Sequence, residues 1–211
     1  MKLRWKIAQY FEAKWWQHYL KGKSLPDYLD WKRNYWKDFL RKIEMEVPTE
    51  ASILDAGCGP AGIFLVFPEN QLTAIDPLLG KCRPIFPHFT DGSLRNARFV
   101  EAPLEQLEAT QKFDVVFCLN AINHVADLEL CLKKLRQATR PGGKLVLSVD
   151  AHNWLFFKHL FQLLPGDILH PHQFDLDDYR LMLEANGLQI LATKTLKKEF
   201  FFNYHVLTLT C

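Results

Sequence analysis

A glycine-rich turn that follows a short apolar run is the part of the chain best suited to hold a ligand. The run ends at Asp55, and residues 57–62 then read Gly-Cys-Gly-Pro-Ala-Gly. Glycine at positions 57 and 59 leaves room for a ligand to approach the backbone closely. A helix that begins after this turn would offer unpaired backbone N–H groups. The spacing of Gly57, Gly59 and Gly62 also fits the dinucleotide-binding pattern, and later segments must decide what that match means.

A second acidic residue, Asp76, ends the next apolar run of the chain. A carboxylate at the end of the second strand of such a unit can accept hydrogen bonds from a ribose diol. The alternative is an aspartate that begins a turn before Pro77. Because the glycine-rich turn lies upstream, we favour the ribose role for Asp76.

Apolar runs and amphipathic segments alternate from residue 52 onward, which predicts strands separated by helices. We expect strands at residues 53–55, 72–76, 97–101, 113–119, 144–149, 188–195 and 201–210. We expect helices at residues 63–67, 128–139, 153–163 and 175–186, with at most a short helix between 77 and 97. This pattern indicates an α/β fold, in which helices cover both faces of a mostly parallel, seven-stranded sheet. The short connection between the last two strands predicts a hairpin and therefore one antiparallel strand.

Ligands of such sheets lie beyond the carboxyl ends of the strands. The residues at those ends form the list of site candidates: Asp55, Asp76, Ala102, Pro103, Leu119, Asn120 and Asp150.

The segment 1–48 is expected to form a helical arm ahead of the main domain, residues 49–211. Leu3, Ile7, Phe11, Trp15 and Tyr19 are spaced by four and line one face of a first helix. A second helix begins near Ser24, as its cap, with Pro26 in the first turn and Asp27 in a capping box. Leu29, Trp36, Leu40 and Ile43 form its apolar face.

The arm carries most of the tryptophans of the chain and an excess of Lys and Arg. One interpretation is an amphipathic cap over an apolar edge of the main domain. The other is a lid with an aromatic wall, or a face for an anionic partner such as phosphate, RNA or acidic lipid. The two are compatible, because a flap over a cleft is also a cap.

The composition bounds the class of protein. The chain has 211 residues, of which 48% are hydrophobic and 24% charged, as in ordinary soluble domains. Its net charge of +2 indicates no particular partner. The five cysteines form no CxxC pair, which favours a reducing cytoplasm over a disulfide framework. We see neither an apolar run long enough to span a membrane nor a signal-peptide core, and expect a cytoplasmic protein.

Residues 50–150 resemble the class I S-adenosylmethionine-dependent methyltransferases, a Rossmann-like family. The similarity rests on four segments in order: Leu54-Asp55-Ala56-Gly57-Cys58-Gly59, Ala74-Ile75-Asp76, Phe113-Asp114-Val115-Val116 running on to Val125, and Arg140-Pro141-Gly142-Gly143. In this family the last of these is a turn before the fifth strand. The expected C-terminal hairpin also agrees with the family.

The resemblance implies roles for the matching positions. Asp55 would orient a bound water or the methionyl amine, while Gly57, Cys58 and Gly59 would pass close to the methionyl part. Asp76 and the adjoining Pro77 would lie at the ribose, and Leu119 and Asn120 near the sulfonium. Pro103 and Leu104 fall in the loop that borders the adenine. The frequent adenine-binding aspartate aligns with Pro103, so the adenine amine would need backbone groups there, or Glu105.

Histidines are the candidates for acid–base chemistry and acceptor contacts. His124 follows the fourth strand, where it would act as a general base or pack as a structural histidine behind the cofactor. His170 and His172 lie in a loop before the helix at 175–186, and we expect them to contact the substrate. With Asp150 they could instead hold a metal. We favour the substrate contact and predict no metal.

These inferences predict an S-adenosylmethionine-dependent methyltransferase that releases S-adenosylhomocysteine. The acceptor is expected to be an oxygen or nitrogen atom of an unidentified small molecule. The basic arm keeps an RNA or protein methyltransferase as an alternative. A nicotinamide-dependent oxidoreductase is a second alternative, which the segments at 113–125 and 140–143 disfavour. The third is a non-catalytic S-adenosylmethionine-binding protein that acts as an interaction partner.

Overall fold

The computed structural model describes residues 24–84, 86, 89, 94–152, 174–200 and 202–211 of the chain. The helix expected at the start of the arm, the helix expected at 153–163 and the loop with His170 and His172 lie outside the described residues.

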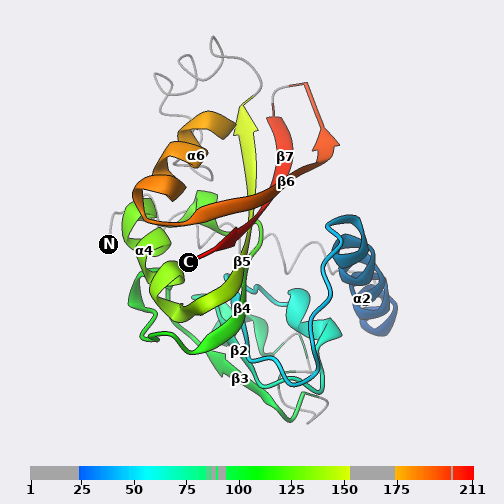
Figure 1. Ribbon diagram of the computed structural model, residues 1–211. Coiled ribbons are helices and arrows are strands. Elements are labelled where there is room, and N and C mark those ends of the chain that lie inside the picture. Colours follow the sequence, from blue (N-terminus) through cyan, green and yellow to red (C-terminus); the bar gives the residue numbers. More distant parts are fainter. Residues whose placement is uncertain (1–23, 85, 87–88, 90–93, 153–173, 201) are drawn as a thin grey trace.

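A seven-stranded sheet with the order β3-β2-β1-β4-β5-β7-β6 organises the described part of the chain (Figure 1). The strands are β1 (Ile53–Ala56), β2 (Leu72–Ile75), β3 (Ala97–Val100), β4 (Phe113–Cys118), β5 (Thr139–His152), β6 (Gln189–Lys198) and β7 (Phe202–Thr210). Strands β1 to β5 pair in parallel, and β7 runs antiparallel to both β5 and β6. The predicted α/β fold and its antiparallel last strand are confirmed.

Helices lie on both faces of this sheet, with α2 on one side and α4 and α6 on the other (Figure 1). The α-helices are α2 (Leu25–Lys42), α3 (Leu79–Cys82), α4 (Leu128–Ala138) and α6 (Leu176–Ala185), and the 3₁₀ turns are η1 (Ile63–Val66), η3 (Leu104–Gln106) and η4 (Ile122–His124). The short helix expected after Gly62 is η1, and the short helix expected between 77 and 97 is α3. In the described residues no helix is both long and apolar enough to cross a membrane.

Two apolar layers form because neighbouring side chains of a strand point to opposite faces. Ile53 of β1 belongs to the layer that contains Trp36 and Phe39 of α2. Leu54, its neighbour, belongs to the layer that contains Leu132 of α4. The second helix of the predicted arm is therefore part of the main core.

The start of α2 differs from the expected capping box. Ser24 is the N-cap residue and a proline follows in the first turn, but the Ser24 side chain makes no capping hydrogen bond. A proline already satisfies part of this helix start, because it has no backbone N–H that needs a partner. By contrast, Asp175 and Asp178 form a complete capping box at α6.

The segment at 140–143 is not a turn before the fifth strand, as we expected, but a bulge inside it. Strand β5 already begins at Thr139, which pairs with Phe113 of β4, and the next pair is Lys144 with Val115. The intervening residues of β5 loop out of the ladder. Gly142, at φ +73°, supplies the left-handed conformation that the bulge needs.

Candidate functional site

The turn after β1 brings the ends of three strands together. The N–H groups of Gly57 and Cys58 donate to the carbonyl oxygen of Ile75, at 2.8 and 3.2 Å, so the turn is fixed to β2. Gly57 has φ +76°, and a Cβ added to it would lie 2.2 Å from the Cβ of Ala121, beyond β4. Only glycine allows the loops after β1 and β4 to approach this closely.

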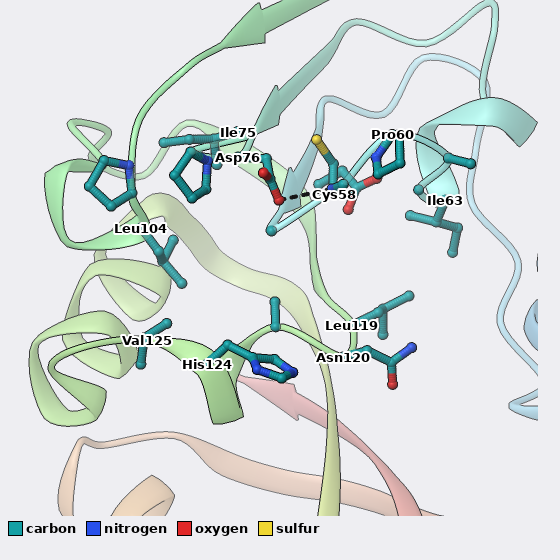
Figure 2. Close-up of a pocket in the computed structure, with 18 of the residues that line it drawn as sticks. Cys58, Pro60, Ile63, Ile75, Asp76, Leu104, Leu119, Asn120, His124 and Val125 are labelled. Carbon is teal, nitrogen blue, oxygen red and sulfur yellow. Dashed lines mark hydrogen bonds between the residues drawn. The ribbon is translucent and has the colours of Figure 1, made fainter. Parts of the chain in front are cut away.

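Asp76 points at this turn rather than away from it (Figure 2). Its Oδ2 accepts a hydrogen bond from the N–H of Gly59 at 3.0 Å, and its Oδ1 accepts one from the N–H of Leu78 at 2.8 Å. The side chain is buried, and this burial raises the pKa of its carboxyl. The acid expected at the ribose therefore lies on the wall of the turn.

Asp55 is buried at the base of the turn and also lines the cavity. Its Oδ2 accepts a hydrogen bond from the N–H of Phe64 at 3.0 Å, which secures the start of η1. Burial, the largest cause, raises the pKa of Asp55 to about 7, and the nearby Asp76 carboxylate contributes to this shift. Our expectation of unpaired N–H groups at the start of this helix is wrong at Phe64, because Asp55 already binds that group.

The third glycine of the pattern serves the same arrangement. A Cβ on Gly62 would lie 2.5 Å from Oδ2 of Asp55 and 2.4 Å from the carbonyl oxygen of Cys58. Glycine at 62 therefore lets the buried carboxylate reach η1. Burial also raises the pKa of the Cys58 thiol well above its ordinary value, so this cysteine is no candidate nucleophile.

All ten residues predicted for the cofactor site line one cavity. It is lined by Asp55, Gly57, Cys58, Gly59, Asp76, Pro77, Pro103, Leu104, Leu119 and Asn120, together with His124. Figure 2 shows Leu104 and Val125 at one end, and Pro60, Ile63 and Leu119 toward the other, with Asp76 between them. The cavity thus runs from an apolar end to the glycine-rich turn.

Glu105, which we considered for the adenine amine, lines the apolar end of the cavity. Its Oε1 already accepts hydrogen bonds from the N–H groups of Ala126 at 2.7 Å and Asp127 at 3.2 Å. These bonds hold the loop before α4, where Asp127 caps the helix.

The floor of the cavity beyond β4 is held by a hydrogen bond across strands. The backbone N–H of Asn120, a residue with φ +53°, donates to Oγ of Ser148 on β5 at 2.8 Å. His124 follows in η4 and faces the same cavity (Figure 2). The hydroxyl of Tyr204 on β7 is buried close to Ser148 and Asn120 without a hydrogen bond of standard geometry to the residues that the structure describes.

Two residues of the arm also line the cavity, and the sequence did not single them out as site residues. Lys32 and Trp36 of α2 lie on its wall, and Nε1 of Trp36 donates to the carbonyl oxygen of Ala61 at 3.0 Å. Trp36 was expected on the apolar face of this helix, and Lys32 lies four residues earlier, on the same face. That spacing was the available clue.

A metal centre does not emerge from the described residues. Among them, no three His, Cys, Asp or Glu side chains gather closely enough to hold an ion. The pair His170 and His172 lies outside the described residues.

Comparison with known proteins finds methyltransferases with similar sequences. The ubiquinone biosynthesis O-methyltransferase of Rickettsia prowazekii is 31% identical over 102 residues, which cover 47% of this chain and 40% of that relative. The chain spans about half the length of the curated relatives that it matches.

Solved structures show the same fold at low identity. The magnesium protoporphyrin IX methyltransferase of Synechocystis PCC 6803, with bound S-adenosylhomocysteine, matches with a TM-score of 0.65 and 18% identity, over 98% of both chains. The 1,6-didemethyltoxoflavin-N1-methyltransferase of Burkholderia thailandensis, with bound 1,6-didemethyltoxoflavin and S-adenosylhomocysteine, has a TM-score of 0.63 at 17% identity. That match covers 100% of this chain and 91% of the other.

A family model provides the assignment. The model described as "Methyltransferase domain" matches residues 28–193, most of the chain, from within α2 to within β6. Fold, glycine-rich turn and family model agree, and the chain belongs to the methyltransferase domain family.

Proposed function

We propose that the protein transfers the methyl group of S-adenosylmethionine to an oxygen or nitrogen atom of a small-molecule acceptor and releases S-adenosylhomocysteine. The observation that carries this proposal is the cavity in which Asp76 faces the glycine-rich turn through its hydrogen bond with Gly59. The solved relatives with bound S-adenosylhomocysteine support the choice of cofactor.

The lining of the cavity favours one direction for the cofactor. Its adenine would lie at the apolar end, beside Leu104 and Val125, with Pro103 next to them. The hydroxyls of its ribose would donate hydrogen bonds to the carboxylate of Asp76. The methionyl part would follow the turn at Gly57 and Gly59, where no side chains obstruct the backbone.

The methyl group would then lie near Leu119 and Asn120, which close the cavity beyond β4. A sulfonium donor is already activated, so the chain must chiefly align the acceptor and exclude water, an effect worth up to ~7–11 kcal/mol. A base is required only where the acceptor must lose a proton, and His124 is the candidate in the cavity. We retain His170 and His172 as candidate acceptor contacts.

We also propose that the N-terminal arm covers the cofactor cavity. Lys32 and Trp36 place α2 on the cavity wall, which favours a role of residues 1–48 in covering the site. We also propose a cytoplasmic location, because the buried cysteines Cys58, Cys82, Cys118 and Cys131 are free thiols.

The Asp76→Ala variant tests the assignment. The variant removes the carboxylate that would accept hydrogen bonds from the ribose. S-adenosylhomocysteine binding should therefore weaken about tenfold or more, as measured by isothermal titration calorimetry. Asp177→Asn, at an exposed position of α6, is the control and should bind like the wild type. Equal affinity of Asp76→Ala and wild type would remove the ribose role. Binding without methyl transfer to any small-molecule acceptor would favour the non-catalytic alternative.

A further inference from the structure

Lys32 is a cationic side chain that lines the cavity and has no acidic partner among the described residues. Its Nζ lies 5.5 Å from the ring centre of Trp31, 5.1 Å from that of Tyr35 and 5.3 Å from that of Trp36. The side chain is half-buried, and its burial lowers the pKa of the ammonium. Aromatic faces therefore hold this cation while no ligand is bound.

Three other cations of α2 are paired with carboxylates of the same helix, whereas Lys32 lines the cavity. Arg33 binds Asp30 at 2.6 Å, and Arg41 and Lys42 both bind Asp38. Within the part of the chain that the structure describes, no carboxylate lies within ion-pair distance of Lys32. A partly desolvated charge without a counter-ion is unfavourable, so an anion that enters the cavity would gain from meeting it.

Asp55 and Asp76, the two acids beside the glycine-rich turn, do not supply that anion, and Glu105 is bound by the N–H groups of Ala126 and Asp127. Asp55 is bound by the N–H of Phe64, and Asp76 by the N–H groups of Gly59 and Leu78. Neither carboxylate lies within ion-pair distance of Lys32. The cavity thus presents two carboxylates along the wall of the turn and β2, and one ammonium on the wall made by α2.

The position of Lys32 indicates which part of the cofactor it would contact. Trp36, one turn further along α2, donates to the carbonyl oxygen of Ala61, so this helix contacts the glycine-rich turn. The apolar end of the cavity, with Leu104 and Val125, lies away from the turn (Figure 2). The methionyl part of the cofactor carries its one carboxylate, and this part is expected at the turn.

We propose that Lys32 binds the carboxylate of the methionyl group and so makes α2 a part of the cofactor site. The inference rests on the proposed function, since it names a contact to the same cofactor. Its consequence is specificity for ligands that keep the carboxylate. The Lys32 ammonium would move from the aromatic rings to the carboxylate when the cofactor binds, which couples α2 to cofactor occupancy.

The test compares two ligands that differ in that one group. Wild-type protein and Lys32→Met are titrated by calorimetry with S-adenosylhomocysteine and with its decarboxylated analogue, which keeps the amine. Lys32→Met should lose about tenfold or more in affinity for S-adenosylhomocysteine, the usual effect of removing a charge-assisted hydrogen bond. Its affinity for the decarboxylated analogue should change less than about twofold, and Lys32→Arg should restore S-adenosylhomocysteine binding.

Lys37→Met, on the exposed side of the same helix, is the matched control and should behave as wild type with both ligands. Added salt should weaken S-adenosylhomocysteine binding to wild type more than to Lys32→Met. Equal losses for both ligands, or no loss for either, would overturn the role of Lys32. A wild-type protein that binds neither ligand would instead refute the proposed function itself.

Discussion

Two buried tyrosine hydroxyls, those of Tyr179 and Tyr204, differ in their hydrogen bonding. The hydroxyl of Tyr179 on α6 donates to Oδ1 of Asn123 at 2.7 Å, and Asn123 is itself buried. The hydroxyl of Tyr204 on β7 is buried close to Ser148 and Asn120, but it makes no hydrogen bond of standard geometry with the described residues. Burial raises the pKa of both phenols, so both donate or accept as neutral groups at ordinary pH. Their removal should therefore have different consequences.

Tyr179→Phe should destabilise the protein by about 1–3 kcal/mol, because it leaves the buried Asn123 carbonyl without its donor. Tyr204→Phe should change the free energy of unfolding by less than about 0.5 kcal/mol, or increase it, because the lost hydroxyl makes no hydrogen bond of standard geometry. Urea denaturation of the ligand-free proteins measures both. Similar losses for the two variants would show that Tyr204 has a partner in solution.

At the scale of elements, the turn between β1 and η1 offers a comparison of two glycines. Gly59 has φ +54°, and nothing lies within 4 Å of an added Cβ. Gly57 has φ +76°, and an added Cβ would meet the Cβ of Ala121 at 2.2 Å. A substitution at Gly59 therefore tests the cost of the backbone conformation alone. A substitution at Gly57 tests that cost together with the contact between two loops.

Gly59→Ala should cost about 1–2 kcal/mol of stability, the usual penalty of a left-handed conformation for an L-residue. Gly57→Ala should cost about 1–3 kcal/mol more, because the loop after β4 must move away. Thermal or urea denaturation measures the difference. In a double-mutant cycle, Ala121→Gly should remove this excess from Gly57→Ala and leave Gly59→Ala unchanged. An additive cycle would contradict the close approach.

The strands and the helix ends were the elements that the sequence predicted best. Strands β1, β2 and β4 are almost fully buried along their length because both faces of the sheet are covered there. Gly187, at φ +73°, ends the last helix region as expected. The bulge around Gly142 was not predictable, because a Pro-Gly-Gly segment is compatible with both a turn and a bulge. Only the pairing of β5 with β4 distinguishes the two. The missing cap at Ser24 shows the same limit, because a capping pattern does not fix a rotamer.

The site residues at the strand ends were predictable from the sequence, whereas the residue contributed by α2 was not. Asp55, Asp76 and the glycines follow strands, and the parallel register of β1 with β2 and β4 places those ends side by side. Lys32 comes from a helix whose packing depends on contacts far along the chain. Its position against the turn follows from the burial of Trp36 between α2 and η1, which local sequence patterns do not encode.

For the whole molecule, the buried carboxyl of Asp55 links folding to pH. Its folded pKa of about 7 exceeds its ordinary value, so the folded protein holds a proton that the unfolded chain loses. Below the unfolded pKa both states are protonated and Asp55 has no effect. As pH rises from about 4 to about 7, the stability of the protein therefore decreases through this group, and the effect is constant above that range.

Asp55→Asn should abolish this contribution while the amide oxygen still accepts from the N–H of Phe64. His205, whose pKa is lowered by burial, contributes the opposite slope in part of the same range, so the difference between variant and wild type is the informative quantity. This difference in unfolding free energy should grow in favour of Asp55→Asn by on the order of 4 kcal/mol between about pH 4 and about pH 7. Urea denaturation across this range measures it, with the exposed Asp177→Asn as a control whose curve should run parallel to wild type. A parallel curve for Asp55→Asn as well would mean that the carboxyl ionises in the folded protein as easily as in water, and that the turn is open to solvent behind β1.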